Sequence, residues 1–174
     1  MKYFYDTEFI DNGKTIDLIS IGIVAEDGRE FYSISNEFDE SKADNWVKEN
    51  VISKLPERLV NKTDSTNNTK LPRANLEHFL WKSREQIKED IIAFIGDNKP
   101  EFWAYYADYD HVVFCQLFGR MMDLPKNFPM YTNDIKQLCN AKGNPRLPEK
   151  GKGEHHALAD AKWVKSAYDF LNSL

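Results

Sequence analysis

The chain has 174 residues, of which 41% are hydrophobic and 13% aromatic, and its formal net charge is −5. This composition excludes an intrinsically disordered chain and predicts one folded domain over residues 1–174. No apolar run reaches the roughly 18–20 residues that span a bilayer, and the N-terminus lacks the layout of a signal peptide, so we expect a cytoplasmic protein with no membrane partner. The net negative charge argues against extended contact with a nucleic-acid duplex, but it allows an enzyme that binds only a short end of the nucleic acid.

Three strands are expected at the start of the chain. Residues 2–10 and 16–25 are apolar and rich in β-branched or aromatic side chains, and a third strand is expected near 29–35. The connecting segments Asp11-Asn12-Gly13 and Asp27-Gly28 have the composition of tight turns. The simplest arrangement of these segments is an antiparallel meander.

The next segment, from about 39 to 74, is weakly patterned. A helix is expected over 41–50, and residues 62–70 form a polar stretch that we expect to be a mobile loop. The segment Ser83-Arg84-Glu85-Gln86 is typical of a capping box, and it predicts a helix that ends at Gly96.

The second half of the chain alternates strand and helix patterns. We expect a buried strand over 102–106, helices over 109–118 and 133–141, and a last helix over 157–171. A meander followed by helices that alternate with parallel strands predicts an α/β fold with a mixed five-stranded sheet flanked by helices.

Asp6 and Glu8 are the first candidate site residues. Residues two apart on a strand project to the same face, so the two carboxylates would stand side by side. Their mutual repulsion would raise the pKa of one of them unless a cation lies between them. The alternative interpretation is the solvent-facing side of an edge strand.

Asp108 and Asp110 open a helix directly after an apolar strand. An acidic residue in the first turn complements the helix dipole, and we assign that capping role to Asp108. Asp110 is expected to point from the carboxyl edge of the strand toward Asp6, which is a common place for sites in open α/β sheets.

His155 and Asp160 are the strongest local signal. Five residues on a helix are about 140° apart, so these two side chains converge only if His155 lies on a loop and Asp160 in the first helical turn. Gly151-Lys152-Gly153 provides a flexible lead-in to such a loop. An imidazole has a pKa suited to a general base, and His156 is a competing candidate for that role because it is adjacent.

Together, Asp6-x-Glu8, Tyr109-Asp110 and His155-x4-Asp160 resemble the three exonuclease motifs of the DEDDh group of 3′–5′ exonucleases, which has a ribonuclease H-like fold. The resemblance spans nearly the whole chain. The stretch from 102 to 111 and the compact length look like a small bacterial and phage branch related to the mycobacterial adenylate-preferring exoribonuclease. The chain departs from the group at Tyr106, where many members carry an asparagine.

The resemblance implies that Asp6, Glu8, Asp110 and Asp160 bind two Mg²⁺ or Mn²⁺ ions and that His155 is the general base. It also implies a homodimer that acts on the 3′ end of single-stranded nucleic acid, with RNA favoured over DNA.

Other site residues and functions are considered beside this assignment. Thr7, Phe9 and Tyr106 are expected to neighbour the terminal nucleotide. A DNA exonuclease, a catalytically silent nucleic-acid-binding module and a phosphohydrolase of free nucleotides remain alternatives.

Overall fold

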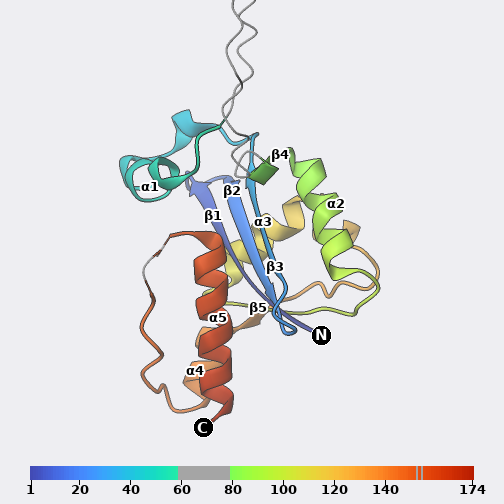
Figure 1. Ribbon diagram of the computed structural model, residues 1–174, viewed down its shortest axis with the longest axis vertical. Helices are drawn as coiled ribbons and strands as arrows, with labels where there is room; N and C mark the ends of the chain where they lie inside the picture. The colour runs from blue at the N-terminus through green and yellow to red at the C-terminus, as the bar shows by residue number, and fades with distance from the viewer. Residues whose placement is uncertain (59–78, 152, 154) are drawn as a thin grey trace, which may run out of the picture.

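The computed structural model describes residues 1–58, 79–151, 153 and 155–174. Within them, a mixed six-stranded sheet has the order β4-β3-β2-β1-β5-β6 and carries helices on both faces (Figure 1). β1 pairs antiparallel with β2, and β2 with β3, whereas β5 runs parallel to β1. The strands are β1 (Lys2–Asp11), β2 (Ile16–Ala25), β3 (Glu30–Ser35), β4 (Trp81–Lys82), β5 (Glu101–Ala104) and β6 (Asn133–Asp134).

The helices pack on the two faces of this sheet. They are α1 (Asn45–Asn50), α2 (Arg84–Ile95), α3 (Asp108–Gln116), α4 (Ile135–Ala141) and α5 (Ala157–Asn172), with short 3₁₀ turns at Glu40–Lys42, Ile52–Lys54 and Met121–Asp123. The arrangement confirms the predicted α/β class and is consistent with a ribonuclease H-like fold. No helix among the described residues combines the length and apolar character needed to cross a bilayer.

The structure corrects the predicted strand count and several boundaries. The sheet has six strands rather than five. Four of them correspond to the predicted ranges, and the two-residue strands β4 and β6 add parallel edges that are too short to leave a pattern. The strand expected over 102–106 ends at Ala104, and the helix expected from 133 begins at Ile135 after Asp134 caps it. The polar stretch at 62–70 lies outside the described residues.

The helix expected over 41–50 is divided in two. Ala43 is buried and has an extended backbone, which separates the 3₁₀ turn Glu40–Lys42 from α1. The capping box before α2 is confirmed: Ser83 accepts from the Gln86 N–H, and the Gln86 side chain accepts in return from the Ser83 N–H. Gly96 ends this helix with a φ of 62°.

Alternation along β1 sends its side chains into two separate cores. Tyr3 and Tyr5 pack with α2 and α3 on one face of the sheet. Phe4 points to the other face, where its ring centre lies 5.2 Å from that of Tyr168 on α5. The same alternation directs Asp6 and Glu8 toward α5 and Thr7 toward α3.

Gly22 lets α5 lie directly on the sheet beside Asp6. It pairs with Asp6 across β1 and β2, and a Cβ at this position would lie 2.3 Å from the backbone nitrogen of Leu158. Ala157 and Ala161 on the facing side of α5 are fully buried, as expected for small residues at a close contact. The first turn of α5 therefore approaches β1 at the point where its carboxylates project.

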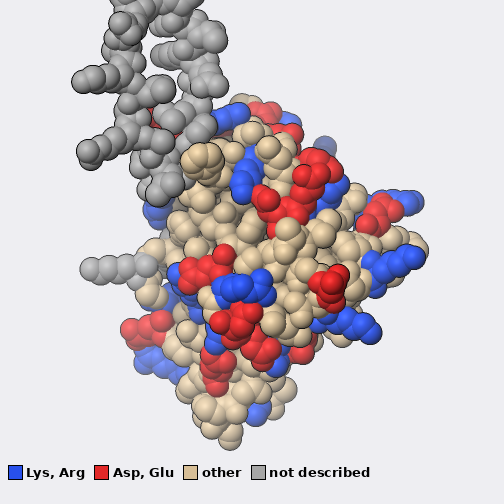
Figure 2. All heavy atoms as spheres, turned by 45° about the vertical axis from the view of Figure 1, so that its right-hand side comes forward, with Lys and Arg blue, Asp and Glu red and all other residues tan. Residues whose placement is uncertain are grey.

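Charged side chains of both signs are interspersed on the face shown in Figure 2, which brings the α2 side of the molecule forward. Neighbouring opposite charges form ion pairs around α2, including Lys82 with Asp90 at 2.6 Å and Lys88 with Glu85 at 2.5 Å. Such a mixed surface provides local charge pairing rather than a long basic track.

Candidate active site

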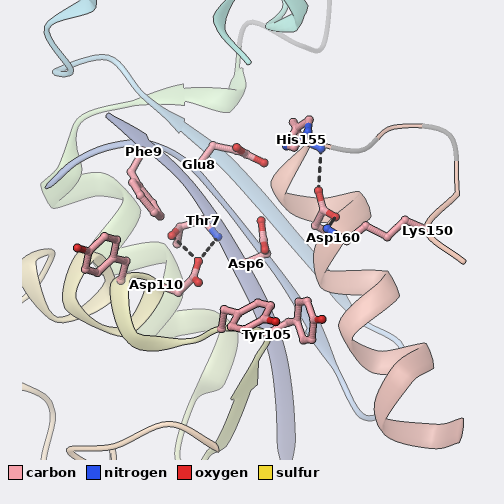
Figure 3. Close-up of a pocket in the computed structure, with 11 residues that line it drawn as sticks. Asp6, Thr7, Glu8, Phe9, Tyr105, Asp110, Lys150, His155 and Asp160 are labelled. Carbon is pink, nitrogen blue, oxygen red and sulfur yellow. Dashed lines mark hydrogen bonds and ion pairs between the residues drawn. The ribbon is translucent and has the colours of Figure 1, made fainter. Parts of the chain in front are cut away.

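A hollow of about 340 Å³ opens where β1 meets the first turns of α3 and α5 (Figure 3). Its walls contain all eight site residues expected from the sequence, together with Tyr105, Tyr109 and Lys150. The eight expected residues are Asp6, Thr7, Glu8, Phe9, Tyr106, Asp110, His155 and Asp160. Residues that are far apart in the chain thus meet at one point of the fold.

Three carboxylates form the centre of this hollow. Asp6, Glu8 and Asp160 each offer one oxygen, and these atoms all lie within 4.8 Å of one another. The alternation of β1 brings the first two to the α5 face, and the predicted position in the first turn of α5 brings the third to meet them. The alternative of a solvent-facing edge strand is excluded, because β1 lies between β2 and β5.

Asp110 joins the hollow from α3, on the other side of β1. Its Oδ1 accepts two hydrogen bonds from Thr7, one from the backbone N–H at 2.8 Å and one from the hydroxyl at 2.7 Å. A hydrogen bond of 2.8 Å from the Ala107 N–H to the Asp134 carboxylate fixes the start of α3. Thr7 lines the hollow as expected, but both of its donors are directed at Asp110.

Asp160 is almost completely buried and is held through both of its oxygens. Oδ2 accepts the backbone N–H of His155 at 2.9 Å, and Oδ1 lies 2.6 Å from the ammonium of Lys150. Short contacts of this kind between charged groups are among the stronger hydrogen bonds in proteins. The orientation of this carboxylate is therefore set by two neighbouring parts of one loop.

The site accumulates negative charge away from water. Burial, reinforced by the charges of Asp110, Glu8 and Asp160, raises the pKa of Asp6 well above its usual range. Burial together with the charges of Asp160 and Asp110 raises the pKa of Glu8 to about 8. Burial also raises the pKa of Asp110 to about 6, although the hydrogen bonds from Thr7 oppose this rise. Such a cluster favours protons or bound cations at neutral pH.

The two adjacent histidines point to different surroundings. His155 has a left-handed backbone with a φ of 65°, lines the hollow, and meets the ring of Trp46 edge-on at 4.7 Å between ring centres. His156 instead stacks on Tyr32 of β3, at 4.4 Å. Burial lowers the pKa of His156. The predicted arrangement, with His155 on the loop before the helix, is confirmed.

Aromatic side chains flank the hollow. Phe9 and Tyr109 meet edge-on at 6.0 Å between ring centres. Tyr106 is 62% exposed and has a left-handed φ of 55°, and its ring packs on Tyr105 at 4.5 Å. A neighbouring hollow of about 350 Å³ shares Thr7, Glu8 and Phe9 with the first and adds Trp46.

Sequence reasoning did not single out Lys150, Tyr105 or Trp46. In the sequence, Lys150 is one of four basic residues that precede His155, with Lys142, Arg146 and Lys152. Trp46 lies in the weakly patterned region, where no spacing links it to a distant histidine. Tyr105 directly follows the apolar strand, and this position is the feature of the sequence that could have indicated its place in the site.

Comparison with known proteins shows the family of the chain. A family model described as the 3′-5′ exoribonuclease Rv2179c-like domain matches residues 1–171. Two curated proteins of Mycobacterium tuberculosis, named 3′-5′ exoribonuclease Rv2179c and 3′-5′ exoribonuclease MT2234.1, are each 45% identical over 165 residues. The alignment covers 93% of this chain and 88% of each relative. The chain therefore belongs to the Rv2179c-like family of 3′-5′ exoribonuclease domains.

Proposed function

We propose that this chain is a divalent-metal-dependent 3′–5′ exoribonuclease of the DEDDh group. It removes nucleoside 5′-monophosphates one at a time from the 3′ ends of single-stranded RNA or RNA overhangs. The observation that carries this proposal is the meeting of Asp6, Glu8 and Asp160 in one hollow, with Asp110 and His155 in its wall. The names of the two relatives support RNA as the substrate.

The donor set fits Mg²⁺ or Mn²⁺. Hard divalent cations prefer oxygen ligands, and three carboxylate oxygens within 4.8 Å of one another can share such an ion. The raised pKa values of Asp6 and Glu8 reflect charge that a bound cation would compensate. We assign two ions to Asp6, Glu8, Asp110 and Asp160. When bound, they would lower the pKa of the attacking water and stabilise the leaving 3′ oxygen.

Each residue of the chain then has a distinct task. His155 acts as the general base and takes the proton of the attacking water, from a loop position that faces the carboxylates. Thr7 fixes the direction of Asp110 through two hydrogen bonds. The backbone N–H of His155 donates to Asp160, and this hydrogen bond fixes the position of the general base relative to the carboxylate.

The terminal nucleotide would lie among the aromatic residues of the hollow. Phe9 and Tyr106 both line the hollow that holds the carboxylates, and a base can stack on such rings without regard to its identity. Thr7 lines the same hollow. We further propose that the protein acts as a homodimer, as the family resemblance implies.

A DNA exonuclease of the same fold is the second candidate. The two differ at the 2′-hydroxyl, which a protein must contact to distinguish RNA from DNA. Degradation of 5′-labelled RNA and DNA in parallel, with Mn²⁺ and with free or blocked 3′ ends, separates these candidates and fixes polarity. We expect stepwise shortening of RNA with a free 3′ end. Unchanged turnover by Asp6→Ala would refute the assignment.

The histidine pair offers a matched test of the base. His155→Ala should lower the rate by about 10²–10⁴-fold, the usual contribution of a general base, and lower the melting temperature modestly because its contact with Trp46 is lost. His156→Ala should lower the melting temperature because its stacking on Tyr32 is lost, while the rate stays within a few-fold of the parent. The reverse pattern would assign the base to His156.

A further inference from the structure

Lys150 reaches the carboxylates from a loop that is fixed on α5. Its Nζ lies 2.6 Å from Oδ1 of Asp160 and 5.2 Å from the centre of the Trp163 ring. Trp163 donates its Nε1–H to the carbonyl of Pro148 at 2.9 Å. The hydrogen bond from Trp163 fixes the loop at Pro148, two residues before Lys150. The ammonium of Lys150 is directed into the hollow (Figure 3).

The ammonium serves more than one carboxylate. Asp160 is buried, and its other oxygen already accepts a hydrogen bond from His155. Burial and like charges raise the pKa of Asp6 and of Glu8, and the charge of Lys150 opposes both rises. Lys150 is thus a counter-charge for Asp6, Glu8 and Asp160, which distinguishes it from a lysine in an ordinary surface ion pair.

A divalent cation bound by Asp160 would lie close to this ammonium. Like charges at such short range repel, so the bound ion and the present position of Lys150 disfavour each other. The lysine side chain has a flexible four-carbon stem and can turn while its loop stays anchored on Trp163. Within the proposed site, a phosphate of the substrate is an anion that this ammonium can contact.

We propose that Lys150 is a phosphate-contacting residue that competes with the divalent cation for Asp160. This inference rests on the proposed function. The ammonium contacts Asp160 in the absence of the cation, and in the proposed complex it contacts the phosphate of the nucleotide. Cation binding frees Lys150 from the first and makes it available to the second, so the two binding events favour each other.

The test is Lys150→Gln, compared by calorimetry with the parent protein. Titration with Mn²⁺ alone should show binding tighter by about tenfold, because the cation no longer competes with a charge-assisted hydrogen bond. Titration with uridine 5′-monophosphate at saturating Mn²⁺ should show binding weaker by about tenfold, because a phosphate contact is lost. If Lys150 had only a structural role, Lys150→Gln would weaken the binding of both Mn²⁺ and the nucleotide.

Lys165→Gln is the matched control. Lys165 lies on the same helix as Asp160, its side chain is 30% exposed against 31% for Lys150, and it pairs with Asp169 at 2.7 Å. It also lies 5.8 Å from the centre of an aromatic ring, that of Phe4. This variant should change neither affinity. If Lys150→Gln does not fold, Lys150→Met retains the aliphatic stem over Trp163.

Each outcome decides the proposal. Tighter Mn²⁺ binding together with weaker nucleotide binding supports it, and an unchanged value of either affinity overturns it. If the parent protein binds no Mn²⁺, the proposed function fails as well. If the parent binds Mn²⁺ and degrades RNA while Lys150→Gln behaves like the parent, only the role of Lys150 is refuted.

Discussion

Gly22→Ala tests whether the close approach of α5 to the sheet builds the site. The added Cβ would lie 2.3 Å from the nitrogen and 2.4 Å from the Cα of Leu158. The first turn of α5 would have to withdraw by roughly 1 Å to restore ordinary van der Waals contact. That turn carries Asp160, so the carboxylate would leave Asp6 and Glu8 by a similar distance.

The expected cost follows from overpacking against backbone atoms. An added methyl group in a packed contact typically lowers the free energy of unfolding by about 1–3 kcal/mol. Part of this loss is offset because the unfolded chain has less entropy when glycine is replaced. For a chain of this size, that corresponds to a fall in melting temperature of about 3–10 °C. A displacement of roughly 1 Å at a catalytic group can lower the rate by about 10²-fold.

Thermal unfolding, Mn²⁺ titration and RNA degradation should be measured on the same preparation. Ile23→Val is the matched control, because Ile23 is the next residue of β2 but packs with α2 and α3 on the opposite face. Ile23→Val should lower the free energy of unfolding by about 0.5–1.5 kcal/mol and leave the Mn²⁺ affinity and the rate unchanged. If Gly22→Ala loses only stability, as Ile23→Val does, then the approach of α5 does not position Asp160.

Two further predictions concern the carboxylates. Because burial and the charges of Asp160 and Asp110 raise the pKa of Glu8 to about 8, the folded metal-free protein holds a proton that the unfolded chain releases. Denaturant unfolding in EDTA should therefore show stability that falls as the pH rises from about 5 to 8, and Glu8 should contribute up to about 1.4 kcal/mol for each pH unit. The fall should be smaller in Glu8→Gln, where only the raised pKa values of Asp6 and Asp110 remain. Rising stability over this range would contradict it. Thr7→Val removes the hydroxyl bond to Asp110 and should weaken Mn²⁺ binding and lower kcat/KM by about tenfold, whereas Thr7→Ser retains both. Parent-like kinetics in Thr7→Val would show that the backbone N–H alone orients Asp110.

The parts of the site that were predictable depend on short-range rules. Alternation along a strand places Asp6 and Glu8 on one face, and helix geometry requires His155 to precede the helix that carries Asp160. Both rules use only a few residues of sequence, and both predictions are confirmed. The same alternation also predicts that Thr7 points the other way, toward α3, where it meets Asp110.

The parts that were missed depend on where distant segments lie in space. Trp46 meets His155 only after α1 has packed against the sheet. Lys150 meets Asp160 only after its loop has packed on α5. The edge strands β4 and β6 have two residues each, so no alternation can develop in them. The division of the helix at Ala43 reflects its burial in a core with Ile10 and Ile19, a long-range contact that overrides local helix propensity.

The acidic charge of the chain is compatible with an RNA substrate because the site concentrates that charge where cations would bind. Asp6, Glu8, Asp110 and Asp160 account for four of the negative charges behind the net value of −5. Two divalent ions would bring the formal charge to about −1, and they would make the hollow attractive to a phosphate. On the face shown in Figure 2, charges of both signs are interspersed. Bound divalent ions would add a local attraction for the phosphates of RNA at the site itself. In this arrangement the cation does two things at once: it compensates the buried carboxylates, and it turns an acidic hollow into one that accepts a nucleic-acid end.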